Sequence, residues 1–590
     1  MGSSLQAWTR ALERTASIGR RTGFSLPTLI DEVAARYGTA PALLGEDFQL
    51  SYAELEERSR RYTRWVVDQD LRAGDVIGVL MPNGADYVAC WLGLSRAGAV
   101  AALLNTHLTG ASLAHAVNTA APRHLIVATE LAAAAMAVRP LLSPTLRYWA
   151  HGGDISDVPR IEPAIAQYSA DPLGAAECAV PGLREPALLI YTSGTTGLPK
   201  AACISHRRLL QWSLWFAGMM NTGPDDRMYD CLPMYHSVGG VVAIGALLVS
   251  GGSVLIRRRF SLGRFWDEVV DSRCTLFQYI GELCRYLAVS PPHPREREHH
   301  LRLCCGNGLR REVWERFQDR FAIPRILEFY AATEANFSLY NCEGKPGAIG
   351  RVPPFLAHRL RIELVRIDLA TGEPPRGEDG LCVRAEADEP GESVSEIQDE
   401  RLNPGSRFEG YTDAAATERK ILRNVLSAGD AWYRSGDLMR RDRNGFFYFV
   451  DRLGATYRWK GENVATAEII AALWSCPGVL DGVAYGVEVP GVEGRAGMVA
   501  IVPLEDFDLA RLHRHFSERL PDYARPVFVR LLSRVEITET FKPKVHAYAA
   551  AGFDPRTISD PLYVYDREPN VFVKLDGVVF ERIRSGAMRW

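Results

Sequence analysis

One segment of the sequence gathers the residue types that bind phosphate. It runs from Tyr191 to Lys200 as YTSGTTGLPK, and it follows the apolar run ALLI, which predicts a buried strand. Glycines let backbone N–H groups point together at an anion, hydroxyls add donors, and a lysine adds a point charge. We therefore predict a loop that holds phosphate groups through Thr192, Ser193, Gly194, Thr195, Thr196, Gly197 and Lys200.

This loop differs from a Walker A phosphate loop. The G-x-x-x-x-G-K-[ST] spacing is absent, and Pro199 stands directly before the lysine. The alternative interpretation is a surface turn rich in serine, threonine and glycine. The density of phosphate-binding residue types directly after a strand favours the phosphate loop.

The elements that must position this loop follow from the hydrophobic pattern. Short β-rich runs alternate with helical patterns from about residue 27 to 335, which is typical of βαβ units and parallel sheets. From about 345 to 450 the runs are short, and Pro, Gly and Asp are frequent, which predicts a smaller and mostly antiparallel β-unit. A third composition after Arg452 predicts a final domain of strands and helices.

Composition excludes several classes of protein. The chain has 590 residues, of which 47% are apolar and 24% charged, and its net charge is −3. These values exclude a disordered, collagenous or coiled-coil chain and give no indication of nucleic-acid binding. No signal peptide is visible, and the cysteines form no C-x-x-C pair, so we expect a cytoplasmic protein without a zinc site.

The N-terminal segment allows two interpretations. Leu5, Trp8 and Leu12 fall on one helical face, and several arginines lie nearby. A basic amphipathic helix of this kind can lie on anionic lipid, which would give peripheral membrane contact. The alternative is a helix that packs on its own domain.

Further motifs make the sequence similar to a known superfamily. YTSGTTGLPK resembles the signature loop of adenylate-forming enzymes, which include acyl-CoA synthetases, luciferases and nonribosomal peptide adenylation domains. YAATE (330–334), SGD (435–437), DR (451–452) and WKGENV (459–464) resemble its other motifs, in the same order. TLFQYIGELCRYL, CGNGLRREVW and AGFDPRTISDPLYV resemble the fatty acid transport protein and very-long-chain acyl-CoA synthetase branch.

The resemblance implies a fold and a two-step reaction. A carboxylate attacks the α-phosphate of ATP, which gives an acyl-adenylate and pyrophosphate, and a thiol, usually that of CoA, then displaces AMP. ATP, Mg²⁺ and CoA are the implied cofactor and substrates. The implied α/β fold has a large N-terminal adenylate-forming domain (1–453), made of α/β subdomains and a small β-barrel-like subdomain. A smaller, mobile α+β domain (454–590) carries the catalytic lysine.

The resemblance also implies roles for the N-terminal motifs. Glu334 and Thr196 would ligate Mg²⁺, a hard cation that takes carboxylate and phosphate oxygens. Thr333 would hydrogen-bond the α-phosphate, Tyr330 would stack on adenine, and His236 would lie near the acyl carboxylate and the thiol entrance. The residues implied to hold the β- and γ-phosphates are Thr195, Thr196 and Lys200. Those implied to form the wall of the nucleotide and acyl site are Gly306, Asn307 and Gly308.

A second group of implied residues lies around the domain boundary and beyond it. Asp437 would accept hydrogen bonds from the ribose hydroxyls, and Arg452 would contact the ribose or a phosphate. Gly454 would be the hinge, and Gly461 would line the pantetheine channel. Lys542 would stabilise the transition state of adenylation.

These observations favour one function and leave alternatives open. The predicted function is ATP-dependent activation of a fatty acid or related carboxylic acid, followed by transfer to CoA. An alternative is a biosynthetic enzyme with another acceptor, such as a diazotase that activates nitrite for reaction with an aryl amine, or an amide-forming ligase. A lipid-uptake protein without catalysis is disfavoured, because Lys200, Glu334, Asp437 and Lys542 are all present.

Overall fold

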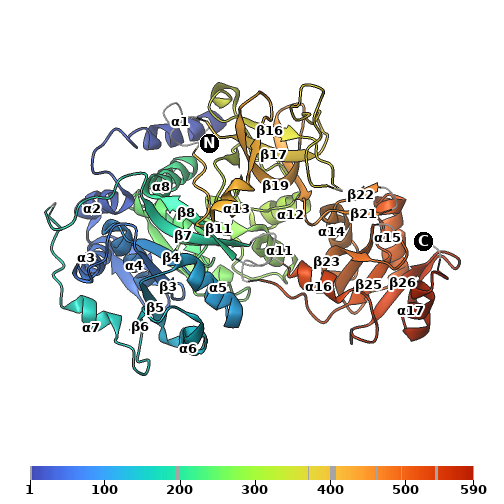
Figure 1. Ribbon diagram of the computed structural model, residues 1–590, viewed down its shortest axis with the longest axis horizontal. Helices are drawn as coiled ribbons and strands as arrows, with labels where there is room; N and C mark the ends of the chain where they lie inside the picture. Colours follow the sequence, from blue (N-terminus) through green and yellow to red (C-terminus); the bar gives the residue numbers. More distant parts are fainter. Residues whose placement is uncertain are drawn as a thin grey trace. The chain divides into compact units, whose positions relative to one another are not determined.

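The chain folds into two compact units. The computed structural model describes residues 3–174, 176–193, 199–369, 371–398, 407–459, 462–492, 494–538 and 543–588, without the side chains of Ser193 and Asn463. The first unit is Met1–Leu360 with Ile397–Ile421, and the second is Arg361–Glu396 with Leu422–Trp590 (Figure 1). The predicted boundary between residues 453 and 454 lies inside the second unit and stays a prediction.

The first unit contains two large sheets, and one of them carries the predicted phosphate loop. Its strands are parallel except for the last, which pairs antiparallel with its neighbour. Its order is β6 (Arg147–His151), β5 (His124–Ala128), β3 (Val76–Leu80), β4 (Val100–Leu103), β7 (Pro186–Ser193) and β8 (Pro199–Ser205). Strands β4 and β5 are buried on both faces, which is the pattern of a parallel sheet covered on both sides.

The other sheet carries the predicted nucleotide wall and the predicted metal ligand. Its order is β14 (Ser338–Asn341), β13 (Ile326–Ala331), β12 (Leu303–Asn307), β11 (Leu276–Ile280), β9 (Arg227–Asp230), β10 (Ser253–Ile256), β1 (Pro41–Leu44) and β2 (Gln49–Ser51). The strands from β13 to β1 run parallel, and those at the two edges run antiparallel to their neighbours. The predicted α/β architecture with parallel sheets is therefore confirmed.

Helices cover these sheets and supply most of the core. One continuous cluster of buried side chains joins residues of both sheets with helices α2 (Leu26–Tyr37), α3 (Tyr52–Asp68), α4 (Ala85–Arg96), α8 (His206–Met220) and α9 (Ile244–Leu248). A second cluster packs α5 (Gly110–Ala120) and α6 (Ala132–Val138) on the other face of the first sheet. Further helices are α10 (Phe265–Asp271), α11 (Gly281–Val289) and α12 (Arg311–Phe321).

The N-terminal helix α1 (Ser4–Thr15) packs on its own unit. The Trp8 ring is buried against Trp215 and Tyr340, at centroid distances of 5.9 and 5.6 Å. The Arg14 guanidinium donates to the carbonyl oxygen of Thr222 at 2.9 Å. Of the face that was a candidate for lipid contact, Trp8 and Leu12 pack against the core of this unit, whereas Leu5 is 56% exposed. Within the described ranges, none of the helices combines the length and apolar surface that a bilayer span requires.

The second unit begins with an antiparallel sheet, as predicted. Strands β16 (Ile362–Val365), β17 (Gly391–Glu396), β19 (Ala431–Arg441) and β20 (Phe446–Arg452) follow one another across it, and β18 (Ile421–Arg423) pairs with β19. The remaining residues form another sheet, in the order β23 (Val479–Glu488), β24 (Arg495–Pro503), β25 (Phe528–Leu531), β26 (Leu562–Asp566) and β27 (Val571–Lys574). Around it lie the hairpin β21 (Tyr457–Trp459) and β22 (Glu462–Val464), with helices α14 (Thr466–Trp474), α15 (Leu509–Arg519), α16 (Val545–Ala551) and α17 (Gly577–Arg584).

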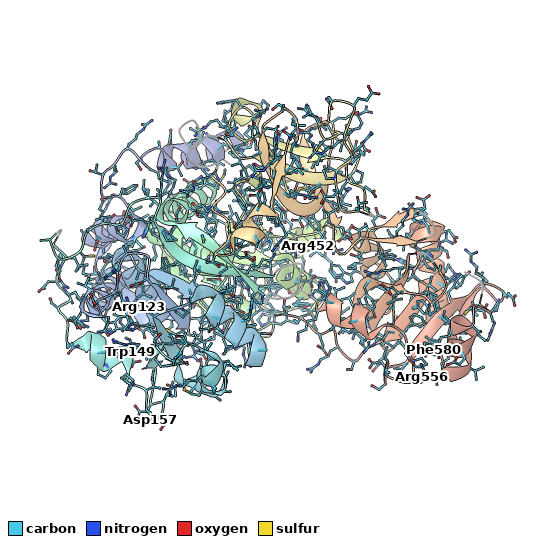
Figure 2. The ribbon with its side chains drawn as sticks, in the orientation of Figure 1. Arg123, Trp149, Asp157, Arg452, Arg556 and Phe580 are labelled. Atoms are coloured by element: carbon cyan, nitrogen blue, oxygen red, sulfur yellow. The ribbon has the colours of Figure 1, made fainter. Side chains whose placement is uncertain are left out.

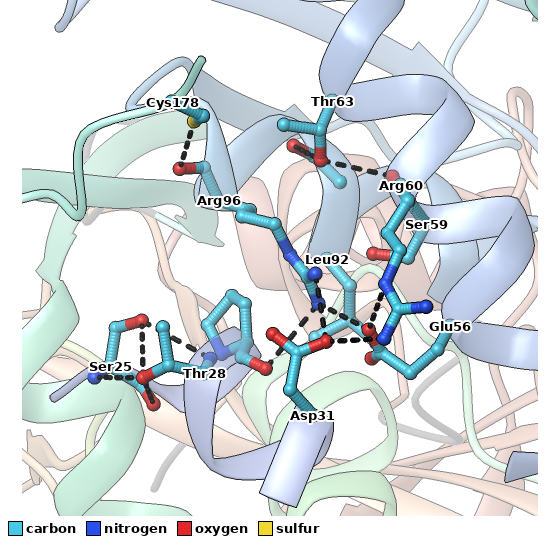
Figure 3. Close-up of polar contacts among 12 residues, drawn as sticks. Ser25, Thr28, Asp31, Glu56, Ser59, Arg60, Thr63, Leu92, Arg96 and Cys178 are labelled. Carbon is cyan, nitrogen blue, oxygen red and sulfur yellow. Dashed lines mark hydrogen bonds and ion pairs between the residues drawn. The ribbon is translucent and has the colours of Figure 1, made fainter. Parts of the chain in front are cut away.

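A buried ion network ties helices α2, α3 and α4 together (Figure 3). The Arg96 guanidinium donates to Glu56 at 2.6 Å and to Asp31 at 3.1 Å, and Arg60 donates to Asp31 at 2.9 Å. Burial alone would lower the pKa of Arg96, but the two carboxylates raise it above its usual value. Burial raises the pKa of Glu56 to about 8, although the charge of Arg96 acts against this shift. Two arginines and two acidic side chains therefore form one hydrogen-bonded network where three helices meet.

Removing one cation from this network should destabilise the first unit. We expect Arg96→Met to lower the free energy of unfolding by about 3–5 kcal/mol, because a buried carboxylate would lose its nearest cation. Urea unfolding followed by tryptophan fluorescence would measure the loss. The control is Arg258→Met, which breaks the exposed pair with Glu130 and should cost no more than about 1 kcal/mol. Equal losses in the two variants would contradict the prediction.

Candidate functional site

The predicted phosphate loop connects two paired strands. Thr192 of β7 lies opposite Lys200 of β8, and Ser193 lies opposite Pro199. The segment therefore closes an antiparallel hairpin, whereas a Walker A loop leads into a helix. Gly194, Thr195, Thr196 and Gly197 lie outside the described residues, as does the side chain of Ser193.

A tyrosine that sequence reasoning missed joins this hairpin to the predicted metal ligand. The phenol of Tyr411 donates to Glu334 Oε1 at 2.8 Å and also hydrogen-bonds the hydroxyl of Thr192. Lys200 Nζ lies 5.8 Å from the centre of the same ring. The structure thus brings Thr192, Lys200 and Glu334 together around one side chain, although nothing in the predicted motifs pointed to Tyr411.

The turn that carries Thr333 and Glu334 follows β13 and is held by a buried arginine. Nη1 of Arg208 donates to the carbonyl oxygens of Thr333 and Glu334 at 3.2 and 3.3 Å. The guanidinium is held in turn by Glu409 at 3.5 Å and by the carbonyl oxygen of Arg407 at 2.8 Å. Arg208 lies in the first turn of α8, a few residues after the predicted loop. A single arginine at this position does not indicate a functional role in the sequence.

The segment containing His236 is fixed by Asn83, which sequence reasoning also missed. The side-chain amide of Asn83 donates to Leu232 O at 2.8 Å and to Arg257 O at 2.9 Å, and its oxygen accepts from Met234 N at 2.9 Å. The residue that follows His236 is Ser237, whose hydroxyl lies 3.2 Å from that of Thr333, so the segment lies beside the predicted phosphate ligand.

The predicted wall of the nucleotide site lies at the carboxyl end of β12. Gly308 has a φ of +81°, which favours glycine. A Cβ built on Gly281 would lie 1.9 Å from the carbonyl oxygen of Gly308. A Cβ on Gly306 would lie 2.2 Å from the carbonyl oxygen of Tyr279, so glycine is required by close packing as well as by conformation. Asn307 Oδ1 is buried and accepts no hydrogen bond from the described residues. An unpaired buried acceptor fits a site for a base that carries an amino group.

A buried carboxyl group supports this wall from behind. Glu328 accepts hydrogen bonds from the Tyr279 hydroxyl at 2.6 Å, from Leu309 N at 3.0 Å and from Gly308 N. Burial raises the pKa of Glu328 to about 8, although these three donors act against the shift. The carboxyl group fixes the path of the chain immediately after Asn307.

The second unit brings the two predicted ribose contacts together. Asp437 and Arg452 lie opposite each other in β19 and β20, and Arg452 Nε is 3.5 Å from Asp437 Oδ1. Arg452, which Figure 2 labels, is 55% exposed, whereas the Asp437 side chain is 12% exposed. Gly436, just before Asp437, has a φ of +78° and donates its N–H to Glu392. The carboxylate is thus fixed on a sharply turned strand while the arginine reaches toward solvent.

The residues around the predicted hinge are linked by Asp451. Its carboxylate accepts from Thr466 N at 2.7 Å, from Thr466 Oγ1 at 2.9 Å and from Arg452 N at 2.8 Å. Between these partners, Gly454 has neither a positive φ nor a neighbour within 4 Å of a built Cβ. Neither conformation nor packing therefore explains the glycine in this arrangement. Gly461 and Lys542 lie outside the described residues.

The comparisons with known proteins agree with these motifs. A model of the AMP-binding enzyme family matches residues 30–387, and one of the AMP-binding enzyme C-terminal domain matches residues 468–542. The mouse long-chain fatty acid transport protein 1 is 40% identical over 575 residues, which cover 96% of this chain and 88% of that protein.

Two solved structures share the fold. ATP-bound MatB from Rhodopseudomonas palustris has a TM-score of 0.75 at 22% identity, and the match covers 89% of this chain and 99% of MatB. The anthranilate CoA ligase AuaEII in complex with anthranoyl-AMP has a TM-score of 0.76 at 18% identity, with coverage of 89% and 97%.

The chain therefore belongs to the AMP-binding enzyme family, and the predicted class, an adenylate-forming ligase that uses ATP, is confirmed. Within that family it is similar over nearly its whole length to the long-chain fatty acid transport proteins, as its sequence motifs had indicated.

The buried Glu328 should make stability depend on pH. Its folded pKa of about 8 lies above the ordinary value of 4.5, so between these values the folded chain keeps a proton that the unfolded chain releases. The free energy of unfolding should therefore fall as pH rises from 5 to 8. Glu328→Gln should flatten this slope in urea unfolding at several pH values, whereas Glu315→Gln, at an exposed site, should not. An unchanged slope in Glu328→Gln would show that the folded state holds an ionised carboxylate.

Proposed function

We propose that this enzyme activates a fatty acid or a related carboxylic acid with ATP and transfers the acyl group to CoA. The observation that carries the proposal is the grouping of Lys200, Thr333 and Glu334, each on a family motif, around Tyr411 and Arg208. The identity to proteins named for long-chain fatty acids supports this class of acid.

Each residue has a defined task in the proposed adenylation. Thr333 donates to the α-phosphate that the carboxylate attacks, and Lys200 neutralises the pyrophosphate end. Glu334, with Thr196, would hold Mg²⁺, which supplies a Lewis acid when bound. The buried carboxyl of Glu334 and the unpaired acceptor of Asn307 suit a cation and a base, respectively. Lys542 adds positive charge as the oxygen leaves phosphorus, since preorganised charge stabilises such transition states most.

The transfer step needs a different set of groups. The CoA thiol attacks the acyl carbon and AMP leaves with the electron pair of the broken C–O bond. Asp437 and Arg452 hold the ribose, and His236 lies at the acyl carboxylate and thiol entrance. Rotation about Gly454 would withdraw Lys542 and bring Gly461 to the pantetheine path.

A product assay tests the function directly. Pyrophosphate and AMP release would be measured with short, long, aromatic and steroidal acids, each with and without CoA, and with nitrite plus an aryl amine. We expect pyrophosphate release with fatty acids, and AMP release that depends on CoA. AMP release that depends on nitrite, or on an amine in place of CoA, would support the alternative acceptors and overturn the proposal.

Removing the predicted catalytic lysine should separate the two half-reactions. Lys542→Ala should slow adenylation by about 10²–10³-fold, the usual effect of losing one transition-state donor. Thiolation of a supplied acyl-adenylate should change little. Lys544→Ala is the matched control, because Lys544 lies two residues away and faces Glu536 at 3.8 Å. Equal losses in both half-reactions would remove Lys542 from this role.

Locking the predicted hinge should block transfer alone. Gly454→Pro fixes φ near −65° and should leave adenylation measurable while it stops transfer to CoA. Gly454→Ala is the control, because the open space around the built Cβ accepts a methyl group. Rapid-quench measurement of each half-reaction would show the difference. Transfer at full rate in the proline variant would place the hinge elsewhere.

A further inference from the structure

Tyr411 lies on a segment whose backbone is attached to the phosphate hairpin. Cys203 N of β8 donates to Gly410 O at 3.0 Å, and Thr412 N donates to Ala201 O at 3.0 Å. Tyr411 therefore extends the sheet beside β8, opposite Ala202. Its ring is buried with Ala202 and Ala416 in a small apolar cluster, so the position of the phenol is set by the backbone and by packing.

The phenol of Tyr411 connects two parts of the proposed site. It donates to Glu334 Oε1 at 2.8 Å, hydrogen-bonds Thr192 of β7, and presents its ring face to Lys200 of β8. A phenol is protonated at physiological pH, so this hydroxyl has a proton to donate to the carboxylate.

We propose that Tyr411 is a positioning residue: its hydroxyl fixes the orientation of the Glu334 carboxylate for Mg²⁺ and ties that orientation to the phosphate-binding hairpin. The inference rests on the proposed function, because it requires Glu334 to hold the metal ion. It assigns Tyr411 no contact with the reacting atoms.

The physical reason lies in the freedom of a glutamate side chain. The backbone of Glu334 is held by Arg208 through its carbonyl oxygen, but this contact leaves the three side-chain torsions unrestrained. A hydrogen bond from a rigid, buried phenol to one carboxylate oxygen restrains them and leaves the other oxygen to face a cation. Loss of such a supporting partner usually lowers metal affinity by about 10–100-fold.

The hydroxyl can be removed without removing the ring. Tyr411→Phe keeps the packing against Ala202 and Ala416 and deletes the donor to Glu334. The matched control is Tyr229→Phe, which deletes a hydroxyl that donates to Glu268 at 2.7 Å, also from a buried tyrosine to a carboxylate. Thermal unfolding of both variants would show that each is folded.

The experiment measures ATP binding by isothermal titration calorimetry at a series of Mg²⁺ concentrations, together with pyrophosphate release. In Tyr411→Phe, the Mg²⁺ concentration at half-effect should rise about tenfold or more, while ATP affinity without metal stays within about twofold of the wild type. Tyr229→Phe should match the wild type.

The outcomes separate the inference from the function beneath it. If the wild type binds ATP and releases pyrophosphate with Mg²⁺, but Tyr411→Phe shows the same Mg²⁺ dependence, the inference is wrong and the proposed function stands. If Glu334→Gln leaves the Mg²⁺ dependence of the wild type unchanged, Glu334 does not hold the ion, and both the assignment of Glu334 and the inference fail. A loss of ATP affinity in Tyr411→Phe without metal would show general distortion and would also overturn the inference.

Discussion

The candidate site of the first unit depends on one buried cation, the guanidinium of Arg208. It binds the carbonyl oxygens of Thr333 and Glu334 at the end of one sheet, and it is anchored at the start of the helix that leaves the other sheet. Glu409 supplies the balancing negative charge, so the cation is not left unpaired in the interior. Two sheets and the segment 407–411 thus meet at a point where carbonyl groups would otherwise lack donors.

The sequence predicted those parts of the structure that depend on local pattern. Alternating β-rich and helical runs predicted the parallel sheets, because a short and continuously apolar run such as VIGVLM is typical of a strand that is buried on both faces. The motifs that contain Lys200 and Glu334 were recognised because they are contiguous. Tyr411, Arg208 and Asn83 were missed, because each acts on a segment distant in sequence, and a single tyrosine, arginine or asparagine has no spacing to reveal such a contact.

The N-terminal helix shows that a pattern visible in the sequence also leaves its packing partner undetermined. Its amphipathic pattern was visible, but a pattern gives only the existence of an apolar face and not what covers it. The structure shows that much of this face packs against α8: a Cβ on Gly218 would lie 2.5 Å from the Cα of Ala11, so the two backbones lie very close together. The packing of Trp8 with Trp215 and Tyr340 completes that interface.

The Asp451 carboxylate has a consequence for the proposed rotation about Gly454. It joins the last residues of β20 to Thr466 at the start of α14, and Gly454 lies on the stretch of chain between them. Rotation about Gly454 that moves α14 away from β20 must break these hydrogen bonds together and hydrate a carboxylate that is 5% exposed. In the proposed rotation, this connection would have to open before the chain on either side of Gly454 could turn, which would place a barrier at the start of the movement. Under the proposed cycle, turnover would then be limited by the opening of this connection even when both chemical steps are fast.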